Sequence, residues 1–351
     1  AGRLATYASA RGVTTHAYDA ATGRLASVTT PEGDAVAFSF DGFLPLSTTW
    51  TGRVAGSVER TFDDDFRVAS RWVDGANTVT YDYDEDGALV RAGAIAINRN
   101  WQYALVDGTS IGGVDDAWTY DAFGDPEHYA ASFGGGTLYE VAWVRDRLGR
   151  VVEETETIGG VTTTRGFTYD SSGRLVEVDE GGAPATTYAW DDNGNRLSRT
   201  PAGGAAQLAS YDAQDRLLSL DGATYLFDAS GDLVSRTVGA QVTTYAYDAL
   251  GNLLAVEGPA GRGISYVVDG RNRRLGVVHD GVLVRGFLYA DGIHPAAELD
   301  GASNVVSLFV YGTRANVPDY LVRAGVTYRI VADRLGSPRL VVNAATGAVA
   351  V

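Results

Sequence analysis

The sequence contains no cysteine and no methionine, and it has only 9 prolines among 351 residues. The absence of cysteine excludes disulfides, so packed secondary structure must hold the fold together, and the compartment is not indicated. Few prolines beside 44 glycines suit paired strands that are joined by many tight turns. Because an initiator methionine is also missing, we expect the sequence to be part of a longer polypeptide.

Positive charge and long apolar runs are scarce as well. The formal net charge is −16 and the isoelectric point is near 4.6, which argues against a nucleic-acid partner because phosphates would be repelled. No apolar run approaches the roughly 18–20 residues that a membrane-spanning helix needs, and there is no signal peptide. No window carries the apolar stripe of an amphipathic helix without a glycine. These absences predict an all-β chain without a membrane span.

What the sequence does contain is a recurring pair, an aromatic residue followed by aspartate, with glycine a few residues later. Successive copies lie about 20 to 22 residues apart over most of the chain, and such a fixed spacing indicates a repeat architecture. Two copies, Tyr211-Asp212 and Phe62-Asp63, lack the glycine. The copies that keep it are Tyr18-Asp19 with Gly23, Tyr83-Asp84 with Gly87, Tyr169-Asp170 with Gly173, Trp190-Asp191 with Gly194, Phe227-Asp228 with Gly231, and Tyr247-Asp248 with Gly251.

Each copy predicts a hairpin. Aspartate, two turn residues and glycine match a type I turn closed by a left-handed residue, in which the aspartate accepts backbone hydrogen bonds. The flanks, such as 162–169 and 175–178, are rich in threonine, valine and aromatic residues and predict strands joined by a three-residue loop with a bulge. A single hairpin is marginal alone, so neighbouring hairpins should pair edge to edge. A sheet of that length must curl, and we expect it to surround a wide lumen.

These repeats resemble the RHS/YD-repeat family, whose name comes from the Tyr-Asp pair. The last third also resembles the RHS-associated core, because three motifs follow in the expected order. They are residues 289–300, residues 311–320, and Asp333-Arg334-Leu335-Gly336-Ser337-Pro338-Arg339. We therefore expect residues 1–288 to form a YD-repeat hairpin array, and residues 289–351 to form the start of a truncated core that continues the same sheet.

The resemblance implies an all-β fold in which YD-repeat hairpins form a continuous spiralling antiparallel sheet, as a segment of a hollow shell. In this family the shell encloses a C-terminal toxin and belongs to secreted or surface-displayed proteins. Arg334 stands where the family usually has histidine, so no role of that histidine is inherited. The paired Asp-Pro-x-Gly motifs of self-cleavage are also missing, since Asp125-Pro126 is followed by His128 in place of glycine.

Other motifs give weaker signals. Residues 82–87 copy the opening of an EF-hand calcium loop, but Gly93 stands where the bidentate glutamate is needed. Residues 108–112 match the G-x-S-x-G string without the helix that must follow it. The aspartate pairs and the four histidines lack catalytic or metal-ligand spacing. We predict no catalytic, cofactor-binding or metal-binding residue, and we interpret residues 92–118 as a repeat with an inserted loop.

The function predicted from these observations is a non-enzymatic shell segment of a secreted or surface protein. Its partners would be the remaining segments of the parent polypeptide and an enclosed C-terminal cargo domain. One alternative is a cell-surface adhesin that holds carbohydrate on exposed aromatic residues. The other is an enzyme acting on polysaccharide, which would need two carboxylates facing each other in a cleft.

Overall fold

The computed structural model describes residues 2–350, and within that range the chain forms strands, turns and one short 3-10 helix, Pro259–Gly261. The first strands are β1 (Thr6–Ser9), β2 (Gly12–Tyr18), β3 (Leu25–Thr29), β4 (Ala35–Asp41), β5 (Leu44–Thr51), β6 (Gly56–Phe62), β7 (Val68–Val73), β8 (Ala76–Tyr83), β9 (Leu89–Ala92), β10 (Ile95–Arg99), β11 (Val106–Ile111), β12 (Val114–Tyr120), β13 (Pro126–Phe133), β14 (Gly136–Arg145), β15 (Val151–Ile158) and β16 (Val161–Tyr169). The others are β17 (Leu175–Glu180), β18 (Ala183–Trp190), β19 (Arg196–Pro201), β20 (Gln207–Tyr211), β21 (Leu217–Leu220), β22 (Ala223–Phe227), β23 (Leu233–Val238), β24 (Gln241–Tyr247), β25 (Leu253–Glu257), β26 (Gly263–Val268), β27 (Arg274–His279), β28 (Val282–Tyr289), β29 (Pro295–Leu299), β30 (Val305–Val310), β31 (Tyr320–Arg323), β32 (Val326–Ala332) and β33 (Pro338–Asn343).

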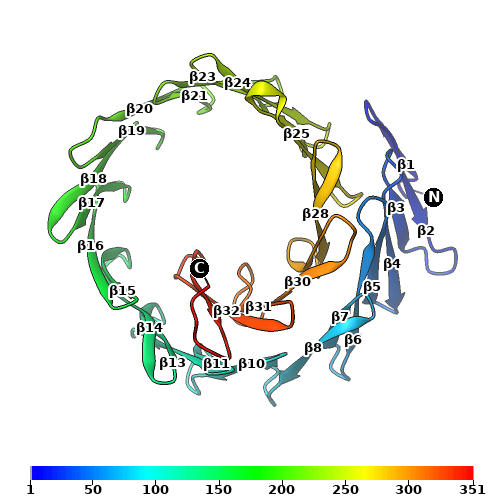
Figure 1. Cartoon of the computed structure of the whole chain (residues 1–351), viewed down its shortest axis with the longest axis horizontal. Helices are drawn as coiled ribbons and strands as arrows, with labels where there is room; N and C mark the ends of the chain where they lie inside the picture. Colours follow the sequence, from blue (N-terminus) through cyan, green and yellow to red (C-terminus); the bar gives the residue numbers. More distant parts are fainter. Residues whose placement is uncertain (1, 351) are drawn as a thin grey trace.

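Each strand pairs with the next one along the chain in an antiparallel sheet of 33 strands. The register slips by one residue at the repeat turns, for example between Thr168 and Tyr169, as a hairpin loop with a bulge requires. Figure 1 shows that the sheet curls into a ring and then passes inside its own beginning, so that it stays open as a spiral. The predicted fold, an all-β spiralling antiparallel sheet, is confirmed.

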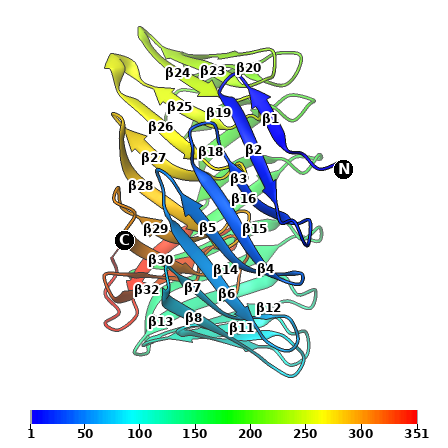
Figure 2. The same cartoon turned by 90° about the vertical axis from the view of Figure 1, so that its right-hand side faces the viewer.

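The overlap divides the chain into three parts, which we name by their residues. The outer layer is 2–156, the single-layer arc is 157–266, and the inner layer is 267–350. Figures 1 and 2 show strands of the inner layer lying against strands of the outer layer, while most of the arc has no second layer over it. Only near the end of the arc does Asp248 contact Arg11 of the outer layer.

The hydrophobic core lies between the two layers. Side chains alternate between the faces of a strand, so the concave face of the outer layer meets the convex face of the inner layer. One cluster joins Val36, Trp50 and Val58 to Leu288 and Leu299, all of which are at most 1% exposed. A second cluster contains, among others, Ile95, Tyr129, Tyr139, Val141, Val310, Tyr320, Val331 and Val342.

The expectation of an inserted loop in residues 92–118 is wrong, because this stretch forms the regular strands β9 to β12. The connection between β10 and β11 is a repeat turn in which Asn100 replaces the aspartate. Its Oδ1 accepts hydrogen bonds from the backbone amides of Gln102 (2.7 Å) and Tyr103 (3.1 Å). Ala104 takes the left-handed conformation with a φ of 54°. The two substitutions hide the turn from a search for aspartate and glycine.

Candidate functional site: the repeat turns, the seam and the inner wall

In each repeat turn the aspartate organises the loop. The Oδ1 atom of Asp170 accepts the backbone amides of Ser172 and Arg174, both at 2.9 Å. Hydrogen bonds from Arg174 lower the pKa of Asp170 below its usual value. The backbone amide of Gly173 donates to the Asp170 carbonyl at 3.0 Å, and Gly173 has a φ of 81°. Gly231 and Gly251 take the same conformation, with φ values of 90° and 79°. The left-handed backbone explains why glycine recurs at this position.

Arginine connects one repeat to the next. The Nε of Arg150 donates to Asp146 at 2.7 Å, and its guanidinium lies 4.7 Å from the ring centre of Tyr169 in the following hairpin. The hydroxyl of Tyr169 donates in turn to the Val151 carbonyl at 2.7 Å. Trp190 and Tyr211 reach back to backbone carbonyls in the same way. Such stacked and forked contacts favour arginine over lysine, and the sequence has 28 arginines and no lysine.

Several repeat turns escaped the sequence search. Their aspartates accept the same pair of backbone amides as Asp170, but most of them follow an aliphatic residue or arginine instead of an aromatic one. Asp121, Asp146, Asp269, Asp300 and Asp333 are of this kind. Tyr120-Asp121 with Gly124 does carry the full signature. A search for aspartate with glycine, asparagine or serine three residues later would have found all five.

The motif at 333–339 forms a repeat turn in its first part, and its last residue contacts the other layer. Asp333 accepts the amides of Leu335 and Ser337, and Gly336 is left-handed with a φ of 91°. Pro338 begins β33. The Nη2 of Arg339 donates to Glu156 of the outer layer at 2.6 Å.

The two layers are joined by a seam of polar contacts inside and beside the core. The guanidinium of Arg329 donates to Asp116 at 2.6 Å and contacts Asp319 at 3.4 Å, and all three residues are buried. Burial is the largest single effect and lowers the pKa of Arg329, but the neighbouring groups Asp116, Tyr129 and Asp319 together outweigh it and hold that pKa above its usual value. Tyr129 donates to Asp116 at 3.2 Å, so the buried carboxylate is well satisfied. This buried ion pair links β12 of the outer layer to β32 of the inner layer.

Further seam contacts follow the overlap along its length. Each joins residues that are far apart in the sequence, and most use arginine or the indole N–H of tryptophan as donor. They are Arg11 to Asp248 (2.9 Å), Trp50 Nε1 to Asp269 (3.1 Å), Arg60 to the Ala290 carbonyl (2.7 Å), Arg71 to the Phe309 carbonyl (2.9 Å), and the Ala94 amide to the Tyr320 hydroxyl (3.0 Å).

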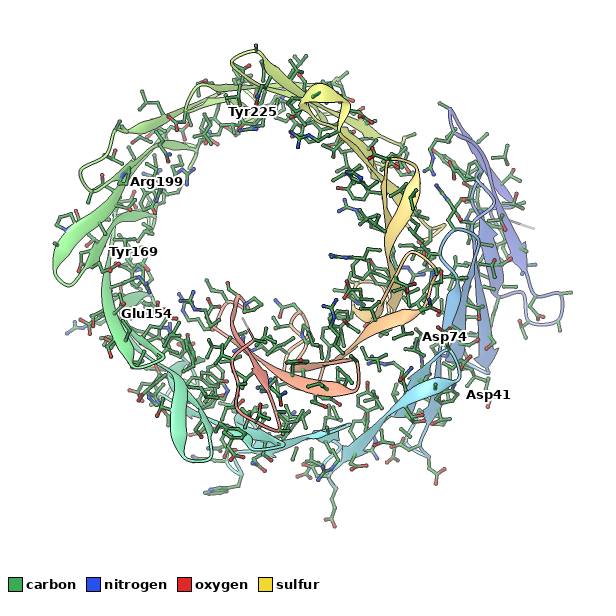
Figure 3. All side chains as sticks on the ribbon, in the orientation of Figure 1. Asp41, Asp74, Glu154, Tyr169, Arg199 and Tyr225 are labelled. Atoms are coloured by element: carbon green, nitrogen blue, oxygen red, sulfur yellow. The ribbon has the colours of Figure 1, made fainter. Side chains whose placement is uncertain are left out.

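The single-layer arc has chemically different faces. On the outer face serine and threonine face each other across strands, as at Ser210 and Ser219, whose hydroxyls are 2.6 Å apart. On the inner face Tyr188 pairs with Arg199, and Tyr225 pairs with Arg236. Figure 3 shows Glu154, Tyr169, Arg199 and Tyr225 along the inside of the wall, around an interior that stays open with all side chains drawn.

The residues of the weaker motifs have other roles in the structure. Asp84 accepts the amides of Asp86 and Ala88 in an ordinary repeat turn. Ser110 lies within β11 between two strands, and its flanks form no helix. Asp115 and Asp116 point to opposite faces of β12, because neighbouring residues of a strand alternate. Across residues 2–350 no group of three or more His, Cys, Asp or Glu is placed to hold a metal ion. No helix in that range is long and apolar enough to cross a membrane.

The sequence matches known proteins along its whole length. The family described as Teneurin YD-shell matches residues 1–350. Teneurin-4 of Mus musculus is 28% identical over 237 residues, which are 65% of this chain and 8% of that protein. Teneurin-3 of Danio rerio is 26% identical over 303 residues, which are 82% of this chain and 11% of that protein. The chain therefore spans only a small part of the length of these relatives.

A toxin and a toxin complex are also similar. Toxin protein Tse5 of Pseudomonas aeruginosa is 40% identical over 55 residues, which are 16% of this chain and 4% of that protein. A solved structure of the Photorhabdus luminescens Tc holotoxin pore superposes with a TM-score of 0.59 at 13% identity, covering 99% of this chain and 22% of that chain. At this identity the likeness shows a shared fold.

Proposed function

Because the chain belongs to the teneurin YD-shell family, we propose that it forms part of the wall of a hollow shell that encloses a cargo domain of the same polypeptide. In this proposal the shell acts outside the cell that makes it, and the segment itself performs no catalysis. Residues 289–351 would be the start of an RHS-associated core that continues the wall without a break, since β28 and β29 pair across residue 289.

The observation that carries the proposal is the curved wall around an open interior (Figure 3). A sheet whose only purpose was stability would bury the inner face of the arc, yet residues 157–266 leave it accessible apart from Ala223. The seam supports the same idea, because it joins the two overlapping layers and leaves the centre of the spiral unfilled.

The test is limited proteolysis of the cargo in the full parent polypeptide. In one variant Leu288, which is fully buried between the layers, is changed to arginine so that the seam opens. The matched control changes Leu226 to arginine, because Leu226 is 61% exposed on the outer face of the arc. We expect the cargo to resist protease in the native protein and in Leu226→Arg, and to be digested quickly in Leu288→Arg. Equal digestion in all three proteins would refute enclosure.

A second candidate is an adhesin, and one observation favours it. The turns of the outer layer expose Phe43 (87%), Trp101 (93%) and Phe123 (92%), and flat aromatic faces bind sugars. Glycan-array binding that is lost in a Trp101→Ala, Phe123→Ala variant, but kept when Leu226 is changed to alanine, would support this function. Absence of binding to any glycan would remove it.

A further inference from the structure

A pocket of about 360 Å³ lies where turns of the inner layer meet the concave face of the outer layer. Trp118 and Tyr120 of β12 form one side, and Arg99 closes it at the end of β10. The turns that follow β30 and β32 supply Arg314 and Arg334. Figure 1 shows β31 and β32 lying inside β10 and β11, so the pocket lies on the concave side of the outer layer, beside the turns of the inner layer. Two aromatic residues and three arginines therefore line one pocket.

The three arginines carry charge that no carboxylate offsets. No aspartate or glutamate lines the pocket, and within residues 2–350 none of the three forms an ion pair. Arg99 donates to the carbonyls of Leu89 (3.2 Å) and Ala104 (3.0 Å). Arg314 lies 5.2 Å from the ring centre of Trp118. These contacts fix the two guanidinium groups and leave further N–H donors unused.

This arrangement is unusual in its surroundings, because most arginines of the repeat turns are neutralised by their own aspartate. A chain with a net charge of −16 has many carboxylates with which to pair three arginines. Unpaired guanidinium groups beside aromatic rings form a site for an anion, since arginine binds carboxylates and phosphates through two parallel hydrogen bonds.

We infer that this pocket binds the carboxylates of an acidic stretch of the enclosed polypeptide, an inference that rests on the proposed function. Trp118 and Tyr120 add apolar surface for the stems of glutamate side chains or for neighbouring residues. The pocket would thus hold one segment of the cargo against the wall.

Arg334 is the residue that best tests the pocket. It is exposed, and within residues 2–350 its side chain forms no hydrogen bond or ion pair, so its replacement should leave the fold intact. Arg147 is the matched control, because Asp146-Arg147-Leu148-Gly149 repeats the sequence Asp333-Arg334-Leu335-Gly336 in another turn. Arg147 lines a different pocket, which contains Asp121, Asp125 and Glu127.

The experiment measures binding of a dye-labelled ten-residue oligoglutamate peptide to the 351-residue chain by fluorescence anisotropy at low salt. We expect Arg334→Gln to weaken binding about threefold and Arg99→Gln with Arg334→Gln about tenfold, as loss of one or two solvent-facing charge contacts implies. Arg147→Gln should change it less than about 1.5-fold, and high salt should weaken it in the native chain.

Equal effects of Arg147→Gln and Arg334→Gln, or no binding of the peptide, would overturn the inference. Binding of tripolyphosphate without binding of oligoglutamate would overturn it in favour of a small inorganic anion. Failure of the shell proposal is distinguishable from these results. In that case the peptide still binds through Arg334, while the cargo of the parent polypeptide is digested whether or not the seam is intact.

Discussion

The overlapped part of the spiral and the single-layer arc use the same repeat but are stabilised differently. The overlap buries two hydrophobic clusters and the Arg329–Asp116 ion pair between its layers, and Arg339 pairs with Glu156 beside them. In the arc, residues 157–266, only Ala223 is buried. The arc depends on its neighbour contacts, such as the Asp212–Arg216 pair and the Tyr211 hydroxyl on the Arg196 carbonyl. The comparison teaches that a wall of hairpins can stand without a core, and that the core serves to join one turn of the spiral to the next.

Acid should produce the largest difference in stability between the two regions, because it acts on many turns at once. Nine turn aspartates have a pKa lowered by hydrogen bonds and partner charges, including Asp170, Asp191, Asp212 and Asp248 in or beside the arc. A lowered folded-state pKa stabilises the protein above the unfolded value, near 3.9, and this stabilisation is lost as the pH falls through the folded value. Because the arc has no buried core to offset this loss, pepsin at pH 3 should cut within 157–266 first. First cuts in the overlap would contradict the comparison.

The seam should respond most to loss of its buried arginine. Arg329→Met leaves the carboxylates of Asp116 and Asp319 buried without their cation, which should lower the free energy of unfolding by about 3–5 kcal/mol. Arg236→Met in the arc removes an exposed arginine and should change it by less than about 0.5 kcal/mol. Denaturant titration measures both. Similar midpoints for the two variants would mean that the seam contributes no more than the open wall.

A repeat turn of the arc should tolerate a side chain poorly. Gly251 has a φ of 79° and open space around it, so Gly251→Ala tests the backbone conformation alone. We expect a loss of about 1–2 kcal/mol in the free energy of unfolding. Gly292 also has open space but lies outside the left-handed region, and Gly292→Ala should cost much less. Equal losses would show that the hairpin geometry does not explain the recurring glycine.

The smallest effect should come from repairing a turn that lacks glycine. Phe66 has a φ of 64° and is 72% exposed, so Phe66→Gly relieves strain and should raise the free energy of unfolding by up to about 1 kcal/mol. Asp215 of the arc has a φ of 61°, but its carboxylate accepts hydrogen bonds from the side-chain amides of Asn193 and Asn195. Asp215→Gly should therefore give no gain. Thermal unfolding of both variants measures the difference.

The repeat chemistry could be predicted from the sequence because it is local. Asp170, Gly173 and the strands around them lie within a few residues of one another, and the turn geometry follows from the side chains themselves. The resemblance to a known family added the spiral. Turns such as that of Asn100 were missed because another residue type performs the same hydrogen bonding.

The seam could not be predicted in the same way. Arg329 and Asp116 are 213 residues apart, and neither carries a local sign that it will be buried against the other. Their contact depends on the accumulated twist and curvature of all the strands between them, which no single repeat encodes. The anion pocket depends on the same overlap, because Arg99 and Arg334 come from different layers.

The order of strand pairing has a consequence for how the chain acquires its shape. Every strand hydrogen-bonds to its neighbour in sequence, so each hairpin can close as soon as it leaves the ribosome, and closure of such short loops is fast. The seam contacts join residues 183 to 238 positions apart and must wait until the last strands exist. Growth of the sheet is thus gradual, whereas docking of one turn of the spiral on another is a late and cooperative event. A ribosome-stalled chain ending near residue 266 should already contain the hairpins of the arc, while the concave face of its outer layer still exposes Trp50 and Tyr129.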